Sequence, residues 1–298
     1  MTATPDLADL LPSWRLALEA ERKAAGTIKN YTLGVTMFLD WCDATGTPPE
    51  LTRPTVQAFT ASLLAGGAEP ATAVARQLAL KRFSAWLADE DEIPADALVG
   101  LRPPKVDRKV VHALTDDELK LLLKACQGKG LKDRRDEAIV RLMLETGMRA
   151  GEVIALRTDD VDRDRRLVTI RRGKGGKGRI APISVQCAAA IDRYIRARRS
   201  HRLADTSTLW LGAAGKTFGY TGLDKTLKER AQVAGITGFH LHLMRHTAAT
   251  RWLRAGGSEG GLMAVAGWSS REMLDRYTGA SAGERAADEA RNLNLGEL

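Results

Sequence analysis

The chain has little cysteine and no long hydrophobic run. Its three cysteines, Cys42, Cys126 and Cys187, lie far apart and form no C-x-x-C pair. This spacing excludes a disulfide framework and a cysteine-rich zinc site, so we expect the three thiols in the core. The longest apolar runs are too short to span a bilayer, and the first residues are acidic where a signal peptide is basic. These absences predict a cytoplasmic protein.

Two common catalytic motifs are also missing. His242 and His246 are four residues apart, a spacing typical of zinc ligands on a helix, but Leu243 and Met244 replace the middle of an H-E-x-x-H motif. Arg245 beside them would repel a dication. The glycine-rich run at 173–178 is not a Walker A loop, because it lacks the G-x-x-x-x-G-K-[ST] order between a strand and a helix. We therefore expect neither a metal nor another cofactor.

Positive charge is abundant and unevenly distributed. The net charge is +8: residues 1–104 hold nine Lys and Arg against thirteen Asp and Glu, which gives −4, and the rest hold thirty-six against twenty-four, which gives +12. The basic part predicts the contact with a polyanion, and nucleic acid is the commonest polyanion partner of a chain with an isoelectric point of about 9.5. A basic surface that serves only solubility is the alternative.

The first third of the chain has a helical pattern. At 298 residues, with 44% hydrophobic and 28% charged residues, the chain is long enough for two globular domains. One apolar stripe from Ile28 to Cys42 predicts an amphipathic helix capped by Thr27 and ending near Gly46. Tyr31 lies on this stripe, which favours a core position. We expect a domain of four or five helices over residues 1–103, with further helices at 54–65 and 71–88.

A linker and a second domain follow. Two prolines and the basic residues after them predict an extended linker over residues 104–112. A capping box from Thr115 to Glu118 then marks the first helix of a domain over residues 113–298. Alternating residues around G-K-G-G-K-G predict a β-hairpin with Lys174 and Lys177 at its tip, although a tip without function is the alternative. We expect helices at 134–145, 152–156, 185–199, 223–234 and 281–292, and strands at 167–172 and 179–183.

The segment from residue 240 to residue 277 carries the most chemistry. His242 and Arg245 stand three apart in a helical pattern, so they can direct a proton carrier and a fixed cation at one point, which suits a phosphate. Trp268 can donate a hydrogen bond through its indole, and Tyr277 supplies a phenol that can act as a nucleophile. A buried structural tyrosine is the alternative for Tyr277. Arg149 is predicted in a tight turn between two helices, in the sequence T-G-M-R-A-G-E-V.

These residues appear in the order Arg149, Lys174, His242, Arg245, Trp268 and Tyr277. In this order the chain resembles the tyrosine recombinases, the family of phage integrases and of Cre-like and Xer-like enzymes, from about residue 13 to about residue 280. T-G-M-R-A-G-E-V matches the first arginine box and adds Glu152 as an accessory acid. G-K-G-G-K-G-R matches the hairpin lysine, and H-L-M-R-H matches the second box. Most members carry histidine where this chain has Trp268, so only hydrogen-bond donation is carried over to that position.

The resemblance implies a mainly α fold with a small antiparallel sheet, in which a helical, SAM-like DNA-binding domain precedes a mixed α+β catalytic domain. It implies a site-specific recombinase or integrase that joins DNA to Tyr277 through a 3′-phosphotyrosyl bond, without metal or ATP. Its expected partners are double-stranded DNA, three further copies in a homo-tetramer on two sites, and an accessory DNA-bending factor, in a bacterial or phage setting. A DNA-binding regulator without catalysis, and a topoisomerase or resolvase acting on one duplex, are the alternatives. The glycine-rich bend at 256–261 is expected to be loose.

Overall fold

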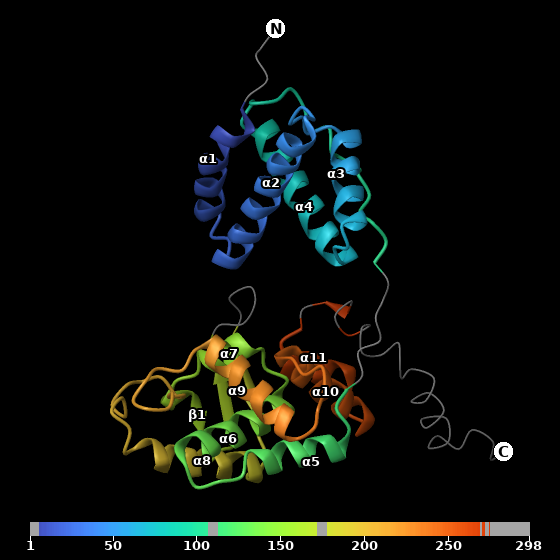
Figure 1. Cartoon of the computed structure of the whole chain (residues 1–298). Coiled ribbons are helices and arrows are strands. Elements are labelled where there is room, and N and C mark those ends of the chain that lie inside the picture. The colour runs from blue at the N-terminus through green and yellow to red at the C-terminus, as the bar shows by residue number, and fades with distance from the viewer. Residues whose placement is uncertain (1–5, 107–112, 172–177, 269, 272–273, 275–298) are drawn as a thin grey trace, which may run out of the picture. The chain divides into compact units, whose positions relative to one another are not determined.

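The computed structural model describes residues 6–106, 113–171, 178–268, 270–271 and 274. It divides into two compact units, Met1–Lys109 and Val110–Leu298 (Figure 1). The predicted linker at 104–112 lies partly outside the described residues, so its bounds stay a prediction. Within the described part of the chain, no helix is both long and apolar enough to cross a membrane.

Unit 1 is a bundle of helices around an aromatic core. Its helices are α1 (Leu7–Ala20), α2 (Ala25–Thr45), α3 (Arg53–Ala65) and α4 (Pro70–Asp89). Trp14, Phe38, Phe59 and Phe83 are buried together between them. Gly34 lets α2 lie close against α4, because a Cβ at this position would come within 2.5 Å of the Ala79 Cβ. The helical N-terminal domain predicted from the sequence is therefore present.

The predicted start of α2 was wrong and its predicted end was right. The helix begins at Ala25, after Ala24 in extended conformation, so Thr27 lies inside the first turn and is not the cap. Gly46 ends the helix with a φ of 65°, a left-handed conformation that glycine adopts without a steric penalty. Tyr31 packs against the unit 1 core, where its ring stacks on Trp14.

Unit 2 combines helices with a small sheet. The helices are α5 (Asp116–Ala125), α6 (Leu131–Thr146), α7 (Ala150–Ile154), α8 (Val185–Arg198), α9 (Tyr220–Val233), α10 (Leu241–Arg254) and α11 (Glu259–Ala266). The strands β1 (Val161–Asp162), β2 (Leu167–Ile170) and β3 (Arg179–Pro182) form an antiparallel sheet in the order β1-β2-β3, and the 3-10 turn η1 (Thr158–Asp160) precedes it. The capping box between Thr115 and Glu118 is confirmed. β1 was not predicted, and α9 begins at Tyr220, three residues before the predicted start of that helix at residue 223.

Helix α6 runs through the middle of unit 2 and packs against α8 and α10 (Figure 1). Its residues Leu142 and Met143 are buried in a core shared with Val168 of the sheet and with Trp210. All three cysteines of the chain are buried, as predicted, and burial raises the pKa of Cys126 to about 12. The turn at the end of α6 leads directly to Arg149, one of the predicted site residues.

The glycine-rich bend at 256–261 is closed, and the expectation of a loose segment was wrong. The Trp252 indole lies so near Gly257 that a Cβ there would come within 2.3 Å of Nε1, and Nε1 donates to the Ser258 carbonyl at 3.0 Å. Ser258 then caps α11 by accepting a hydrogen bond from the Gly261 N–H at 3.1 Å. The glycines therefore allow an indole to pack on the backbone, and the second half of the bend is helix.

Candidate active site

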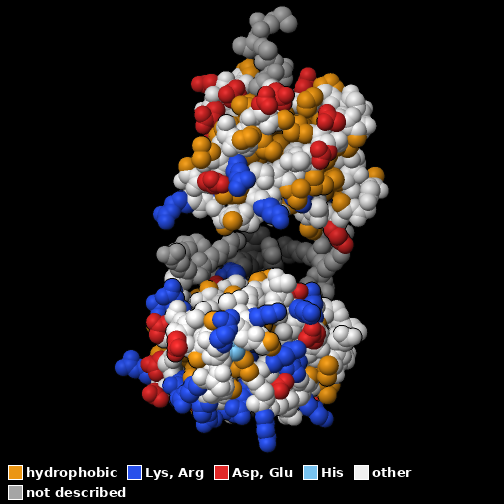
Figure 2. All heavy atoms as spheres, turned by 60° about the vertical axis from the view of Figure 1, so that its left-hand side comes forward, with side chains coloured by type: hydrophobic (Ala, Val, Ile, Leu, Met, Phe, Trp, Pro, Cys, Tyr) orange, Lys and Arg blue, Asp and Glu red, His pale blue; other side chains and the backbone are white. Residues whose placement is uncertain are grey.

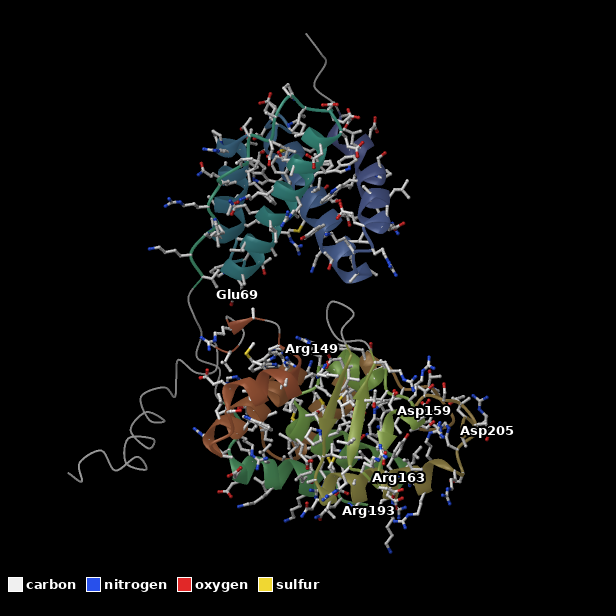
Figure 3. The ribbon with its side chains drawn as sticks, turned by 180° about the vertical axis from the view of Figure 1, so that it is seen from behind. Glu69, Arg149, Asp159, Arg163, Arg193 and Asp205 are labelled. Atoms are coloured by element: carbon white, nitrogen blue, oxygen red, sulfur yellow. The ribbon has the colours of Figure 1, made fainter. Side chains whose placement is uncertain are left out.

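Arg149 stands at the start of α7, directly after the turn that ends α6. Gly147 has a φ of 58° and terminates α6, so the chain reverses and presents Arg149 as the N-cap of α7. The Glu152 carboxylate accepts the Arg149 backbone N–H at 2.9 Å and its Nη1 at 3.0 Å. The Arg149 side chain is 25% exposed, so its guanidinium is held on one side by protein and meets solvent on the other. Figure 3 shows Arg149 between the α10–α11 pair and the strands.

Arg245 reaches the same turn from α10. Its side chain is buried, and its Nη1 donates to the Gly147 carbonyl at 2.5 Å. This hydrogen bond joins α10 to the backbone two residues before Arg149. The guanidinium carbon of Arg245 also lies 5.2 Å from the centre of the Trp268 ring, a cation–π distance. The two arginines predicted to hold one phosphate thus come from segments that meet at Gly147.

His242 occupies the first turn of α10 with an exposed side chain. Desolvation by the protein around the imidazole lowers its pKa, and the positive charges of Arg245 and Arg149 lower it further. An ordinary histidine titrates near pH 6.5, so the His242 imidazole is mainly neutral at pH 7 and able to accept a proton. His240, the residue before the helix, caps α10 by accepting the Leu243 N–H on Nδ1 at 3.2 Å.

Trp268 follows α11 and is 5% exposed. Gly267, with a φ of 65°, ends α11 and turns the chain so that the indole packs on α10 and α11. Its neighbours in this cluster include Ala249, Leu253 and Leu262. The residue predicted to donate a hydrogen bond to the phosphate is therefore a buried ring that lies against Arg245.

Sequence reasoning missed Arg179, the first residue of β3. Its side chain is 10% exposed and pairs with Glu152, with Nη2 to Oε2 at 2.8 Å and Nη1 to Oε1 at 3.1 Å. Burial opposes ionisation of Glu152, but hydrogen bonds from Arg179 and Arg149 outweigh it and leave the pKa of Glu152 below its ordinary value. One buried carboxylate thus serves two arginines.

Two of the predicted site residues lie outside the described part of the chain. Lys174 belongs to the connection between β2 and β3, and both flanking strands are described. Tyr277 lies three residues beyond Leu274, which is buried. Among the residues described, no cluster of three or more metal-ligating side chains occurs.

Two family matches cover most of the chain. Residues 10–92 match the N-terminal SAM-like domain of phage integrases, and residues 112–284 match the Phage integrase family itself. The chain belongs to the phage integrase family. As a member it is a site-specific tyrosine recombinase, an enzyme of DNA strand exchange. The alternative without catalysis and the alternative acting on one duplex are not supported by these matches.

The chain is similar to tyrosine recombinases of the Xer type. It is 28% identical to the tyrosine recombinase XerD of Bifidobacterium longum over 272 residues, which cover 87% of this chain and 88% of that one. It is 30% identical to the tyrosine recombinase XerC 2 of Ralstonia nicotianae over 270 residues, covering 87% and 78%.

Solved structures agree with the fold. The XerA recombinase matches with a TM-score of 0.52 and 27% identity, over 92% of this chain and 94% of that one. The XerH recombinase bound to a palindromic difH substrate matches with a TM-score of 0.72 over 91% and 80%, and its 18% identity makes it a likeness of fold alone.

Proposed function

We propose that this recombinase cuts and rejoins duplex DNA through Tyr277, with Arg149 and Arg245 holding the scissile phosphate. The observation that carries the proposal is the hydrogen bond from Arg245 to the Gly147 carbonyl, two residues before Arg149. Because of it, two guanidinium-bearing segments from distant parts of the sequence meet beside His242, whose pKa responds to both charges. A phosphodiester bound there would meet two fixed cations and a neutral base.

The arginines supply the electrostatic part of the reaction. A phosphodiester is an anion, and attack by an oxygen nucleophile adds negative charge to its non-bridging oxygens in the transition state. Each guanidinium can donate two N–H groups to such oxygens and remains charged at any working pH. Donors fixed in place before the reaction stabilise this charge without a reorganisation cost, which is the role that metal ions fill in other phosphoryl-transfer enzymes.

Two proton transfers complete the cleavage step. The Tyr277 hydroxyl, with an ordinary pKa near 10, gives its proton to His242 as its oxygen bonds to phosphorus. The bond from phosphorus to the 5′-oxygen breaks, and Lys174 protonates that oxygen, which leaves a 5′-hydroxyl and a 3′-phosphotyrosyl link. Trp268 donates to a phosphate oxygen and takes no part in proton transfer. The link conserves the phosphodiester energy, so a 5′-hydroxyl from another strand can reverse the step without ATP.

Double-stranded DNA is the substrate in this proposal, and its contact with unit 2 is electrostatic. Figure 2 shows many Lys and Arg side chains on the face of unit 2 in view, consistent with the excess of thirty-six basic over twenty-four acidic residues beyond residue 104. In unit 1, Arg76 and Lys81 on α4 donate to the carbonyls of Asn30 and Leu101. These two basic side chains therefore have a structural part in addition to any DNA contact.

Exchange between two duplexes involves four strands, so we propose a homo-tetramer on two DNA sites as the working unit. A likeness of fold alone, a lambda integrase tetramer bound to a Holliday junction, is compatible with this assembly. The segment 281–298, outside the described residues, is the proposed subunit contact. Its deletion should leave binding to a single site intact and abolish recombination between sites. The accessory DNA-bending factor stays a prediction.

A suicide substrate tests the proposed nucleophile. A DNA duplex nicked close to the cleavage position loses a short strand after attack, so the covalent adduct accumulates and resists SDS. The wild-type protein should form this adduct, and Tyr277→Phe should form none. Tyr220→Phe is the matched control, because Tyr220 is 57% exposed at the start of α9, and it should retain the adduct. An adduct of equal yield with Tyr277→Phe would refute the assignment.

A further inference from the structure

Arg179 links three parts of unit 2 through one side chain. It begins β3, directly after the connection between β2 and β3. Its Nη1 and Nη2 donate side by side to the Glu152 carboxylate of α7, and its Nε donates to the Val265 carbonyl of α11 at 2.8 Å. The strand, the arginine turn and the end of α11 are therefore joined at a single guanidinium that is 10% exposed.

The backbone before Trp268 lies directly against this guanidinium. A Cβ on Gly267 would come within 2.8 Å of the Arg179 Nη1 and 2.9 Å of its Cζ, closer than real Cβ contacts. Gly267 also has a φ of 65°, which a side chain would strain. The glycine thus meets two requirements at once: it ends α11, and it lets the guanidinium approach the chain that carries Trp268.

We propose that Arg179 is a positioning residue for phosphodiester cleavage, which holds the carboxylate that orients Arg149 and the backbone that directs Trp268 onto Arg245. The inference rests on the proposed function of this site. Through Glu152 the guanidinium fixes the first arginine, and through Val265 and Gly267 it fixes the indole packed on the second. Both phosphate-binding cations therefore depend on one side chain that does not reach the phosphate.

The two parallel hydrogen bonds from Arg179 to Glu152 explain why residue 179 must be an arginine. Glu152 is buried and accepts both nitrogens of a planar group in parallel, while the third nitrogen of that group points to a carbonyl on another helix. A lysine ammonium is a point charge without this planar geometry and cannot reach all three acceptors at once. Arg179→Lys should therefore restore only part of what Arg179→Gln loses.

Arg171 offers a matched control at the other side of the same connection. It follows β2 and pairs with the carboxylates of Asp160 and Asp159, the latter at 2.8 Å. Asp159 lies well apart from Arg149 in Figure 3. Arg171 therefore ties its side of the connection to η1 through ion pairs, whereas Arg179 forms its ion pair with Glu152 and a hydrogen bond with α11. If Arg179 served the hairpin alone, both substitutions would have the same effect.

The test is single-turnover cleavage of the nicked substrate at saturating DNA, with binding measured separately. Misplacement of a catalytic group by about 1 Å commonly costs about 100-fold, so Arg179→Gln should cleave roughly 100-fold more slowly. Its DNA dissociation constant should stay within about threefold of wild type, since no binding group is removed. Arg179→Lys should fall between, and Arg171→Gln should cleave at the wild-type rate. Wild-type cleavage by Arg179→Gln, or equal loss in Arg171→Gln, would overturn the proposal.

A sulfur-containing substrate separates the two routes by which Arg179 could act. With sulfur in place of the bridging 5′-oxygen, the leaving thiolate needs no proton, so a defect in leaving-group protonation is rescued. Arg179→Gln should remain slow on this substrate, because the defect lies in the phosphate-binding arginines. Rescue would mean that Arg179 acts through the hairpin and would overturn the proposal.

Two further results keep the outcome unambiguous. If Arg179→Gln does not fold, Arg179→Lys decides, and a wild-type cleavage rate in that variant overturns the proposal. If the wild-type protein forms no adduct on either substrate, the proposed function fails. If it does form the adduct and Arg179 proves dispensable, the positioning role alone fails.

Discussion

Replacing Glu152 by glutamine removes a charge that two arginines share. Glu152 accepts two hydrogen bonds from Arg149, at 2.9 and 3.0 Å, and two from Arg179, at 2.8 and 3.1 Å. Glutamine keeps one acceptor oxygen and turns an amide NH₂ toward guanidinium donors. The variant therefore leaves a buried cation, Arg179, without its counter-charge.

The expected loss of stability follows from burial. Removing one partner of a buried ion pair costs about 3–5 kcal/mol. Arg149 is 25% exposed and can recover hydration, so the lower end applies, about 3 kcal/mol in the free energy of unfolding at pH 7. Glu137→Gln is the matched control. Glu137 also accepts from two arginines, but these are 27% and 40% exposed, so about 1 kcal/mol is expected.

The pH dependence of this difference has a definite sign. The pKa of Glu152 is lowered in the folded protein, so its ionised form stabilises the fold. This contribution is complete above the unfolded pKa of about 4.3 and is lost as the pH falls through the lower, folded pKa. The difference in the free energy of unfolding between wild type and Glu152→Gln should therefore be constant from about pH 7 to pH 5 and shrink below about pH 4.

Urea unfolding of the full chain, followed by circular dichroism, measures both quantities. The transition that also shifts in Glu137→Gln reports unit 2, because Glu137 lies on α6. A loss smaller than about 1 kcal/mol for Glu152→Gln at pH 7 would contradict the burial argument. A gap that widens toward low pH would contradict the sign of the pKa shift.

Three further perturbations probe other parts of the chain. Tyr194→Phe removes the hydroxyl that accepts the Leu211 N–H at 2.8 Å in a fully buried place, so it should cost about 2 kcal/mol in urea unfolding, whereas an unchanged midpoint would contradict this. The pKa of His242, measured by proton NMR, should lie below about 6.5 and should rise in Arg149→Gln, because this substitution removes a nearby positive charge. A fall of this pKa in Arg149→Gln would contradict the electrostatic cause. Gly34→Ala should destabilise unit 1 by about 1–3 kcal/mol despite the higher helix propensity of alanine, because its methyl collides with Ala79, and a raised melting temperature would refute this.

Local chemistry made much of the fold predictable. The Thr115 capping box and the glycines that end α2 and α6 act within one helical turn, so their effect is visible in a short stretch of sequence. The start of α2 was mispredicted because the preceding backbone enters the helix two residues before Thr27 without any side-chain cap. β1 is two residues long, too short for a pattern.

Long-range pairing decided what the sequence could not predict. In β3 the apolar Ile180 is 59% exposed, while the charged Arg179 and Ala181 lie inside. Arg179 is buried because it pairs there with the carboxylate of Glu152, 27 residues earlier in the sequence. The residues of the two arginine boxes were identified by resemblance, and their catalytic roles, with those of Lys174 and Tyr277, remain proposals.

One backbone carbonyl links the two arginines that we propose as phosphate ligands. The Gly147 carbonyl accepts the hydrogen bond from Arg245, and Arg149 lies two residues after Gly147 in the same turn. The glycine also admits Ala248 and Ala266 to within 3.7 Å of where its Cβ would stand, so α10 and α11 are seated on that very turn. The hydrogen bond to Gly147 therefore ties the position of Arg245 to the turn that precedes Arg149. A movement that pulls the Arg245 guanidinium away from this turn must therefore break this hydrogen bond.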